Sequence, residues 1–138
     1  MSMKKISIFA SGGGSNAQKI HDYFKGNDLI AIDSVVTNNR KAKVLERSKE
    51  WNCEQFIVTR EEFRSSDQLS TWLLNRDTDL IVLAGFLWLV PESLLKAFPN
   101  KIVNIHPALL PKYGGKGMHG MNVHKAVEVA KEKESLPE

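Results

Sequence analysis

The sequence predicts an α/β protein with a Rossmann-like, doubly wound and mostly parallel sheet. Short apolar runs rich in β-branched residues recur along the chain, at residues 6–10, 30–37, 55–58, 80–84 and 101–105. Helix-length segments separate these runs, and a glycine-rich loop directly follows the first one. Because ligands of such sheets bind at the carboxyl ends of the strands, we expect the function to lie in the loops that follow the strands.

The segments between the apolar runs carry helix start signals. Thr59 with Glu62, and Ser65 with Gln68, both fit the capping box, in which a hydroxyl side chain and an acid or amide three residues later satisfy the first N–H groups of a helix. We therefore predict one helix after Thr59 and another after Ser65.

Apolar residues within two of these segments have helical spacing. The side chains expected to face the sheet are Leu69, Trp72, Leu73, Leu94, Leu95 and Phe98. Pro91 suits the first turn of the later helix, and Pro99 with Asn100 ends it before the last apolar run. The predicted order is therefore a regular alternation of strands and helices.

Composition sets the broad class. The 138 residues suit one domain, and their net charge of +3 comes from scattered residues rather than from a basic run that would bind nucleic acid. No apolar stretch approaches the ~20 residues that span a bilayer, and the N-terminus has no signal-peptide pattern. We expect a cytoplasmic protein that binds neither nucleic acid nor membrane. Cys53, the only cysteine, excludes an internal disulfide and a cysteine-based zinc site, and we interpret it as buried filler rather than a nucleophile.

The loop Ser-Gly-Gly-Gly-Ser-Asn, residues 11–16, predicts an anion site. Glycines let the backbone approach a ligand, and the N–H groups at the start of the following helix attract an anion such as phosphate. The loop lacks the lysine of a Walker loop and departs from G-x-G-x-x-G because residue 17 is alanine. Strand two ends in Val36 and Thr37 rather than an acid, which disfavours a dinucleotide site. The alternative is a tight turn that only caps the helix.

Asn104 and His106 form a second candidate site after the last apolar run. Residues two apart in an extended chain point to the same side, so both side chains are expected to face one site. A carboxamide can donate to a developing oxyanion, and an imidazole can move protons near neutral pH, which suits acyl transfer. The alternative is a histidine that only bonds a neighbouring backbone group, and the chemistry alone leaves both interpretations open.

The segment Asn-Ile-His-Pro-Ala-Leu-Leu-Pro-Lys-Tyr, residues 104–113, resembles the signature of the 10-formyltetrahydrofolate-dependent formyltransferases. The glycine loop and the Val-Leu-Ala-Gly-Phe of residues 82–86 also match that family, in the same order. Within it, His106-Pro107 and residues 111–113 resemble the branch that acts on glycinamide ribonucleotide. The resemblance covers nearly the whole chain up to about His124.

This resemblance implies an enzyme of purine biosynthesis that transfers the formyl group of 10-formyltetrahydrofolate to the amine of glycinamide ribonucleotide, without a metal. It assigns the ribonucleotide phosphate to Gly14, Ser15 and Asn16. It also assigns stabilisation of the tetrahedral oxyanion to Asn104 and His106. The binding partners it implies are therefore two small molecules.

The resemblance places the folate beside Leu87, Trp88, Leu89, Val90 and Asn104, with the pterin held largely by backbone and apolar contacts. Trp88 departs from the pattern, because many relatives carry arginine there, so a contact made by that arginine side chain is in doubt. The alternative for Trp88 and Leu89 is a place in the core.

The C-terminal end also departs from the family. We interpret residues 1–138 as one formyltransferase domain, incomplete at its C-terminal end, because the family continues with more strands and an acidic residue that pairs with the catalytic histidine. Glu132, Glu134 and Glu138 are poor substitutes for that acid. The alternatives are a fragment of a longer chain and a shortened relative that binds without catalysing. In a fragment, an apolar sheet edge would be exposed and would favour self-association, and a homodimer is one predicted assembly. His119 and His124 are interpreted as surface histidines, with the alternative that His124 matches a histidine of the family. No metal site is indicated.

Other functions compete with this one. Methionyl-tRNA formyltransferase and formyltetrahydrofolate hydrolase share the Asn-x-His neighbourhood, but the glycine loop argues against both. A function of a different class is a catalytically silent module that binds folate or a nucleotide phosphate. Folate binding without turnover would identify such a module. A nicotinamide-dependent dehydrogenase is disfavoured by the broken glycine fingerprint.

Overall fold

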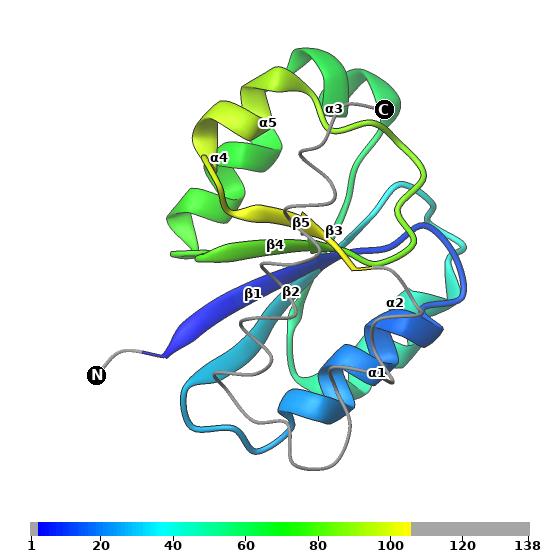
Figure 1. Ribbon diagram of the computed structural model, residues 1–138. Coiled ribbons are helices and arrows are strands. Elements are labelled where there is room, and N and C mark those ends of the chain that lie inside the picture. Colours follow the sequence, from blue (N-terminus) through cyan, green and yellow to red (C-terminus); the bar gives the residue numbers. More distant parts are fainter. Residues whose placement is uncertain (1–2, 106–138) are drawn as a thin grey trace.

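The computed structural model describes residues 3–105, which form one parallel sheet with helices on both faces (Figure 1). The strands, in the order β3-β2-β1-β4-β5 across the sheet, are β1 Lys4–Phe9, β2 Ile30–Thr37, β3 Glu54–Ile57, β4 Leu80–Leu83 and β5 Ile102–Asn104. The helices are α1 Ser15–Phe24, α2 Lys43–Ser48, α3 Arg60–Ser65, α4 Gln68–Asn75 and α5 Glu92–Ala97, and η1 Lys49–Trp51 is a short 3-10 helix. The predicted Rossmann-like fold is confirmed, and each predicted strand lies within two residues of its expected bounds.

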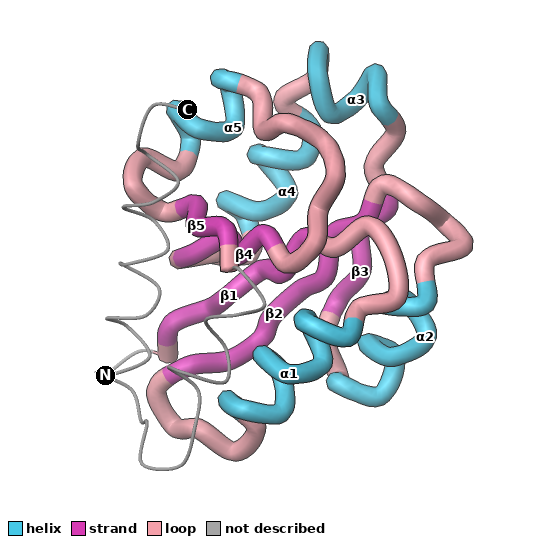
Figure 2. The backbone as a smooth tube through the Cα atoms, turned by 45° about the vertical axis from the view of Figure 1, so that its right-hand side comes forward, coloured by secondary structure: helices cyan, strands magenta, loops and turns pink. Residues whose placement is uncertain are grey.

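Two apolar clusters, one on each face, hold the layers together. Figure 2 shows α1 and α2 beneath the sheet and α3, α4 and α5 above it. Because side chains alternate along a strand, Ile8 of β1 joins the cluster under α1, whereas the next residue, Phe9, joins the cluster under α4. Both side chains are fully buried. This burial on both faces explains why the strands read as continuous apolar runs.

The chain order creates a switch point beside β1. From β1 the chain moves outward through β2 and β3, and it then returns to the other side of β1 with β4 and β5. The loops after β1 and β4 therefore leave neighbouring strands towards opposite faces, at the carboxyl edge where such sheets bind ligands.

One predicted capping box is confirmed and the other is wrong. Thr59 Oγ1 accepts from the Glu62 N–H at 3.2 Å, and the Thr59 N–H donates to Glu62 Oε1 at 3.0 Å. Ser65 instead ends α3, and Asp67 is the N-cap of α4 without a side-chain cap. The serine that bonds the start of α4 is Ser66, whose Oγ accepts a hydrogen bond from the Gln68 N–H at 3.0 Å. A hydroxyl two residues before a donor forms a tight local turn, which competes with the box.

The predicted apolar faces are confirmed except at Leu95. Leu69, Leu73, Leu94 and Phe98 are buried, and Trp72 lies half-buried at the edge of the same cluster. Leu95 is 47% exposed, so the prediction that it faces inward is wrong. Adjacent residues of a helix lie about 100° apart, so the six-residue α5 turns only one of the two leucines to the sheet.

Candidate functional site at the carboxyl edge of the sheet

The glycine loop connects β1 to α1, and Gly14 is the residue that fixes its course. Gly14 is the N-cap of α1 with φ at 79°, a left-handed conformation that a side chain disfavours. A Cβ atom added at Gly14 would lie 2.7 Å from Cβ of Val44 in α2. Gly12 and Gly13 have no atom within 4 Å of the same position. Only Gly14 is therefore required to be glycine by both conformation and space.

The two polar residues after Gly14 stand at the start of α1. Ser15 is exposed and Asn16 is half-buried, and neither side chain has a hydrogen-bond partner among residues 3–105. The buried Ala17, Ile20 and Phe24 fix α1 against the sheet, as their spacing predicts. The structure thus brings the three predicted phosphate residues together at a helix N-terminus, where an anion is favoured.

Helix α2 bonds the outer side of the glycine loop, which the sequence did not reveal. The Val44 N–H donates to the Gly12 carbonyl at 3.2 Å, and Arg47 Nε donates to the Gly13 carbonyl at 2.7 Å. Arg47 Nη1 also lies 3.5 Å from Gln18 Oε1 in α1. The loop is thus held between α1 and α2. In the sequence, the positive charge of Arg47 is the only signal for this contact.

Ser11 joins the glycine loop to the loop after β4. Its N–H donates to the Gly85 carbonyl at 3.2 Å, and its Oγ accepts from the Leu87 N–H at 2.9 Å. Ser11 itself is 6% exposed, and its bond to the Leu87 N–H is partly buried. Ser11 therefore sets the spacing between the glycine loop, where the phosphate is predicted, and the loop after β4, where the folate is predicted.

The side chains of the loop after β4 divide into two groups. Leu87 and Leu89 are 81% and 94% exposed, which excludes the alternative that Leu89 belongs to the core. Trp88 is half-buried, because its ring packs 5.6 Å from that of Phe63 in α3. The guanidinium of Arg60 lies 5.0 Å from the centroid of the Trp88 ring, at cation–π distance. Trp88 therefore anchors the loop to the α3 face, while the two leucines project from it.

Asn104, the last residue of β5, lies beside the end of β4. It is in register with Leu83, and the next N–H, that of Ile105, donates to the Leu83 carbonyl at 3.0 Å. Val103 and Ile105 are both buried in the cluster under α1, so the exposed Asn104 points to the opposite side of the strand. The structure thus brings Asn104, the glycine loop and the loop after β4 to one edge of the sheet.

Several predicted residues lie outside the described residues. They are His106, the two surface histidines His119 and His124, and the glutamates Glu132, Glu134 and Glu138. The predicted pairing of Asn104 with His106 and the histidine's role therefore stay predictions.

Cys53 follows η1 and fits its predicted structural role. It is half-buried, with Sγ 3.7 Å from the Ser48 carbonyl. Burial, together with the nearby carboxylates of Asp33 and Glu54, raises the pKa of the thiol to about 11. At neutral pH the residue is a thiol rather than the thiolate that a nucleophile requires.

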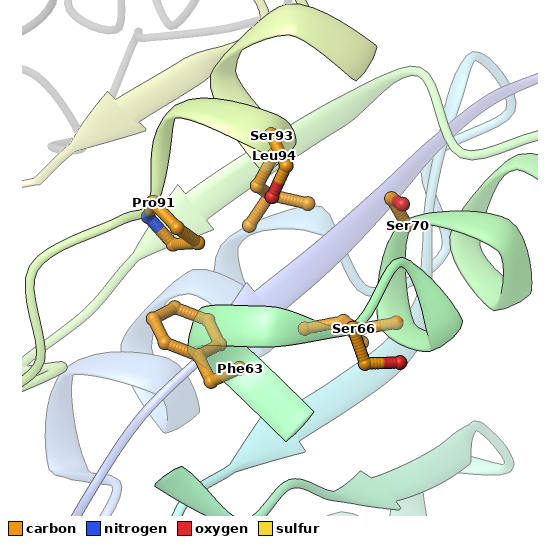
Figure 3. A pocket seen from close by; sticks show the side chains of 7 residues that line it. Phe63, Ser66, Ser70, Pro91, Ser93 and Leu94 are labelled. Carbon is orange, nitrogen blue, oxygen red and sulfur yellow. The ribbon is translucent and has the colours of Figure 1, made fainter. Parts of the chain in front are cut away.

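A small hollow lies between α3, α4 and α5, beside the end of the loop after β4 (Figure 3). Its lining residues are Phe63, Ser66, Leu69, Ser70, Pro91, Ser93 and Leu94. Its volume of about 10 Å³ has room for roughly one water molecule. This hollow is therefore too small for either predicted substrate.

Residues 3–105 show neither a membrane span nor a metal-binding cluster. Within this range, no helix is long and apolar enough to cross a membrane. The same residues contain no cluster of three histidine, cysteine or acidic side chains that could hold a metal ion.

Comparison with known proteins identifies the family. Residues 4–134 match the model of the formyl transferase family. The chain belongs to this family. It is 40% identical over 133 residues to the chloroplastic phosphoribosylglycinamide formyltransferase of Arabidopsis thaliana, covering 90% of this chain and 44% of the relative. It is 38% identical over 118 residues to phosphoribosylglycinamide formyltransferase of Haemophilus influenzae, covering 82% of this chain and 56% of the relative. This formyl transferase chain therefore spans about half the length of these curated relatives.

Solved structures agree with the family assignment. Glycinamide ribonucleotide transformylase 1 from Geobacillus kaustophilus aligns with a TM-score of 0.71 at 34% identity, covering 93% of this chain and 69% of that one. The phosphoribosylglycinamide formyltransferase from Streptococcus pneumoniae aligns with a TM-score of 0.65 at 37% identity, covering 92% of this chain and 67% of that one. The predicted resemblance is confirmed.

Proposed function

We propose that this formyl transferase chain moves the formyl group of 10-formyltetrahydrofolate to the amine of glycinamide ribonucleotide, a step of purine biosynthesis. One observation carries the proposal: the glycine loop follows β1, the loop after β4 follows the adjacent strand, and Asn104 ends β5 next to it, all at one edge of the sheet. The names of the relatives, which include phosphoribosylglycinamide formyltransferase, support the same reaction.

The first part of the proposal concerns the ribonucleotide. Its phosphate would bind at Gly14, Ser15 and Asn16, where the N–H groups of the first turn of α1 and the free side chains can donate to it. Anchoring the phosphate fixes one end of the substrate and leaves the amine end to extend along the edge towards β5.

The second part concerns the folate. Its flat ring system would lie on the loop after β4, against the exposed Leu87 and Leu89 and the half-buried Val90. The ring of Trp88 is already packed on Phe63, so we propose that Trp88 acts by holding the loop, while the backbone and the leucines contact the ligand. Two bound substrates would then meet beside Asn104.

The chemistry requires orientation and charge stabilisation. The amine nitrogen forms a bond to the formyl carbon, and the carbonyl oxygen becomes an oxyanion to which the Asn104 carboxamide and the His106 imidazole donate. The bond from carbon to the folate nitrogen then breaks, and the proton lost by the amine ends on that nitrogen. The reaction balances without a covalent enzyme intermediate and, in this proposal, without a metal.

Two further predictions belong to this proposal. We propose that the chain acts in the cytoplasm, although two relatives are named as chloroplastic. The homodimer predicted from the sequence stays a prediction, which light scattering of the purified chain would test.

Replacement of His106 tests the proposed chemistry. His106→Ala should lower kcat by at least about a hundredfold, the usual contribution of a positioned acid–base group, while the Kd of the folate changes little. His119→Ala is the matched control, because that histidine is predicted to lie on the surface and should leave kcat unchanged. A loss of less than about tenfold for His106→Ala would exclude the proposed role. Folate binding without turnover by the unmodified chain would instead favour a silent binding module.

A further inference from the structure

Helix α2 contacts two successive carbonyl groups of the glycine loop. The Gly12 carbonyl accepts from the Val44 N–H at 3.2 Å, and the Gly13 carbonyl accepts from Arg47 Nε at 2.7 Å. The second bond is the shorter one, and its donor is a charged group, which makes such bonds roughly twice as strong as neutral ones.

These two bonds determine where the next two N–H groups point. In a trans peptide the C=O and N–H bonds point in opposite directions, and residues 3–105 contain no cis peptide. The N–H groups of Gly13 and Gly14 therefore point away from α2. Among residues 3–105, neither N–H has a hydrogen-bond partner. The loop thus presents successive donors on the side opposite α2, an arrangement that suits anions.

The Arg47 side chain has few other polar contacts. In the described part of the chain it forms no ion pair, and its only other polar contact is the Gln18 carboxamide. An exposed arginine side chain is ordinarily free to move, and its conformational entropy opposes fixing it on one carbonyl. Here the short bond to the Gly13 carbonyl fixes the side chain, and Gln18 Oε1 in α1 lies at 3.5 Å from Nη1.

We infer that Arg47 is a positioning residue of the phosphate site: its bond to the Gly13 carbonyl turns the Gly14 N–H towards the phosphate. This inference rests on the proposed function for the identity of the ligand. Arg47 acts from behind the loop and does not touch the phosphate, so its effect should depend on whether the ligand carries that phosphate.

Two substitutions separate the hydrogen bond from the other properties of arginine. Glutamine places its Nε2 donor at the same position along the side chain as arginine Nε, and methionine places a methyl group there. Both remove the charge, so the difference between Arg47→Gln and Arg47→Met reports on the hydrogen bond alone. Lys49→Gln is the control for the loss of one nearby positive charge, because Lys49 is exposed and has no side-chain bond among the described residues.

The experiment measures dissociation constants by calorimetry for glycinamide ribonucleotide and for the same compound without its phosphate. Arg47→Met should weaken binding of the ribonucleotide about tenfold and leave binding of the phosphate-free compound unchanged. Arg47→Gln should stay within about threefold of the unmodified chain for both compounds, as should Lys49→Gln. Formyl transfer is measured separately on the same samples.

Three outcomes would overturn the inference. Equal weakening of both compounds by Arg47→Met would mean that Arg47 only supports the fold. Equal effects of the methionine and glutamine substitutions would remove the hydrogen bond as the cause. An unmodified chain that binds both compounds alike would also overturn it. Loss of formyl transfer alone does not bear on the inference about Arg47. A chain that transfers no formyl group but shows the expected phosphate dependence would support the role of Arg47. The same result would refute the proposed reaction.

Discussion

The loops after β1 and β4 leave neighbouring strands, yet they are held in different ways. In the glycine loop, α2 bonds the Gly12 and Gly13 carbonyls and fills the space beside Gly14. The loop after β4 is held by the bond from the Leu87 N–H to Ser11 Oγ and by the packing of Trp88 on Phe63. It leaves the side chains of Leu87 and Leu89 exposed.

This difference matches the ligands that we propose. A phosphate is recognised by fixed backbone dipoles, which work only when the loop is already in place. A flat ring system is recognised by apolar surface, which stays exposed until the ligand covers it. We therefore expect the glycine loop to tolerate little change in its backbone and the loop after β4 to tolerate more.

Gly14→Ala should have the largest effect. The left-handed φ of 79° costs a side chain about 1–2 kcal/mol, and the approach to Val44 at 2.7 Å adds about 1–3 kcal/mol of overpacking. The free energy of unfolding, measured by urea denaturation, should fall by about 3 kcal/mol. Gly12→Ala is the control and should change it by less than about 1 kcal/mol, because that position has open space and no left-handed φ. Equal losses for the two variants would contradict the account.

Ser11→Ala should have an intermediate effect, because it removes the acceptor that joins the two loops. The partly buried Leu87 N–H would lose its partner, at a cost of about 1 kcal/mol when water can replace the hydroxyl. Hydrogen exchange at the Leu87 amide should become faster, and the KM values of both substrates should rise together. Ser93→Ala is the control, because Ser93 is exposed and has no hydrogen bond among the described side chains. An unchanged exchange rate at Leu87 would mean that the loops are not coupled through Ser11.

Arg60→Gln should have the smallest effect. The guanidinium 5.0 Å from the Trp88 centroid is exposed, and such a cation–π contact contributes about 0.5–1 kcal/mol. We expect a small rise in the Kd of the folate, measured by fluorescence, with no change in the Kd of the ribonucleotide. Arg64→Gln removes another exposed charge of α3 and should change neither value. A larger effect on the ribonucleotide than on the folate would show that the two loops do not divide the ligands as proposed.

The sequence alone predicted the fold and the edge at which the candidate residues meet, because strand spacing and burial on both faces are local patterns. It did not predict which glycine of the loop is indispensable, because the answer depends on Val44, which lies far along the chain. The links made by Arg47 and Ser11 were missed for the same reason.

Two local errors have a related cause. Ser65 was predicted to cap α4, although the chain turns at Ser66 one residue later, and spacing cannot distinguish neighbouring serines. Leu95 was predicted to face inward, although the short α5 turns only Leu94 to the sheet. A one-residue change in register is enough to exchange a buried side chain for an exposed one.

The most direct test of the central claim is a mass balance of formyl transfer by the purified 138-residue chain. 10-formyltetrahydrofolate labelled in its formyl carbon is mixed with glycinamide ribonucleotide, and both products are measured with time. The account predicts equal amounts of labelled formylglycinamide ribonucleotide and unlabelled tetrahydrofolate, at a rate that falls sharply when the phosphate is removed from the ribonucleotide. Release of labelled formate with no labelled ribonucleotide, or a rate that does not depend on the phosphate, would contradict it.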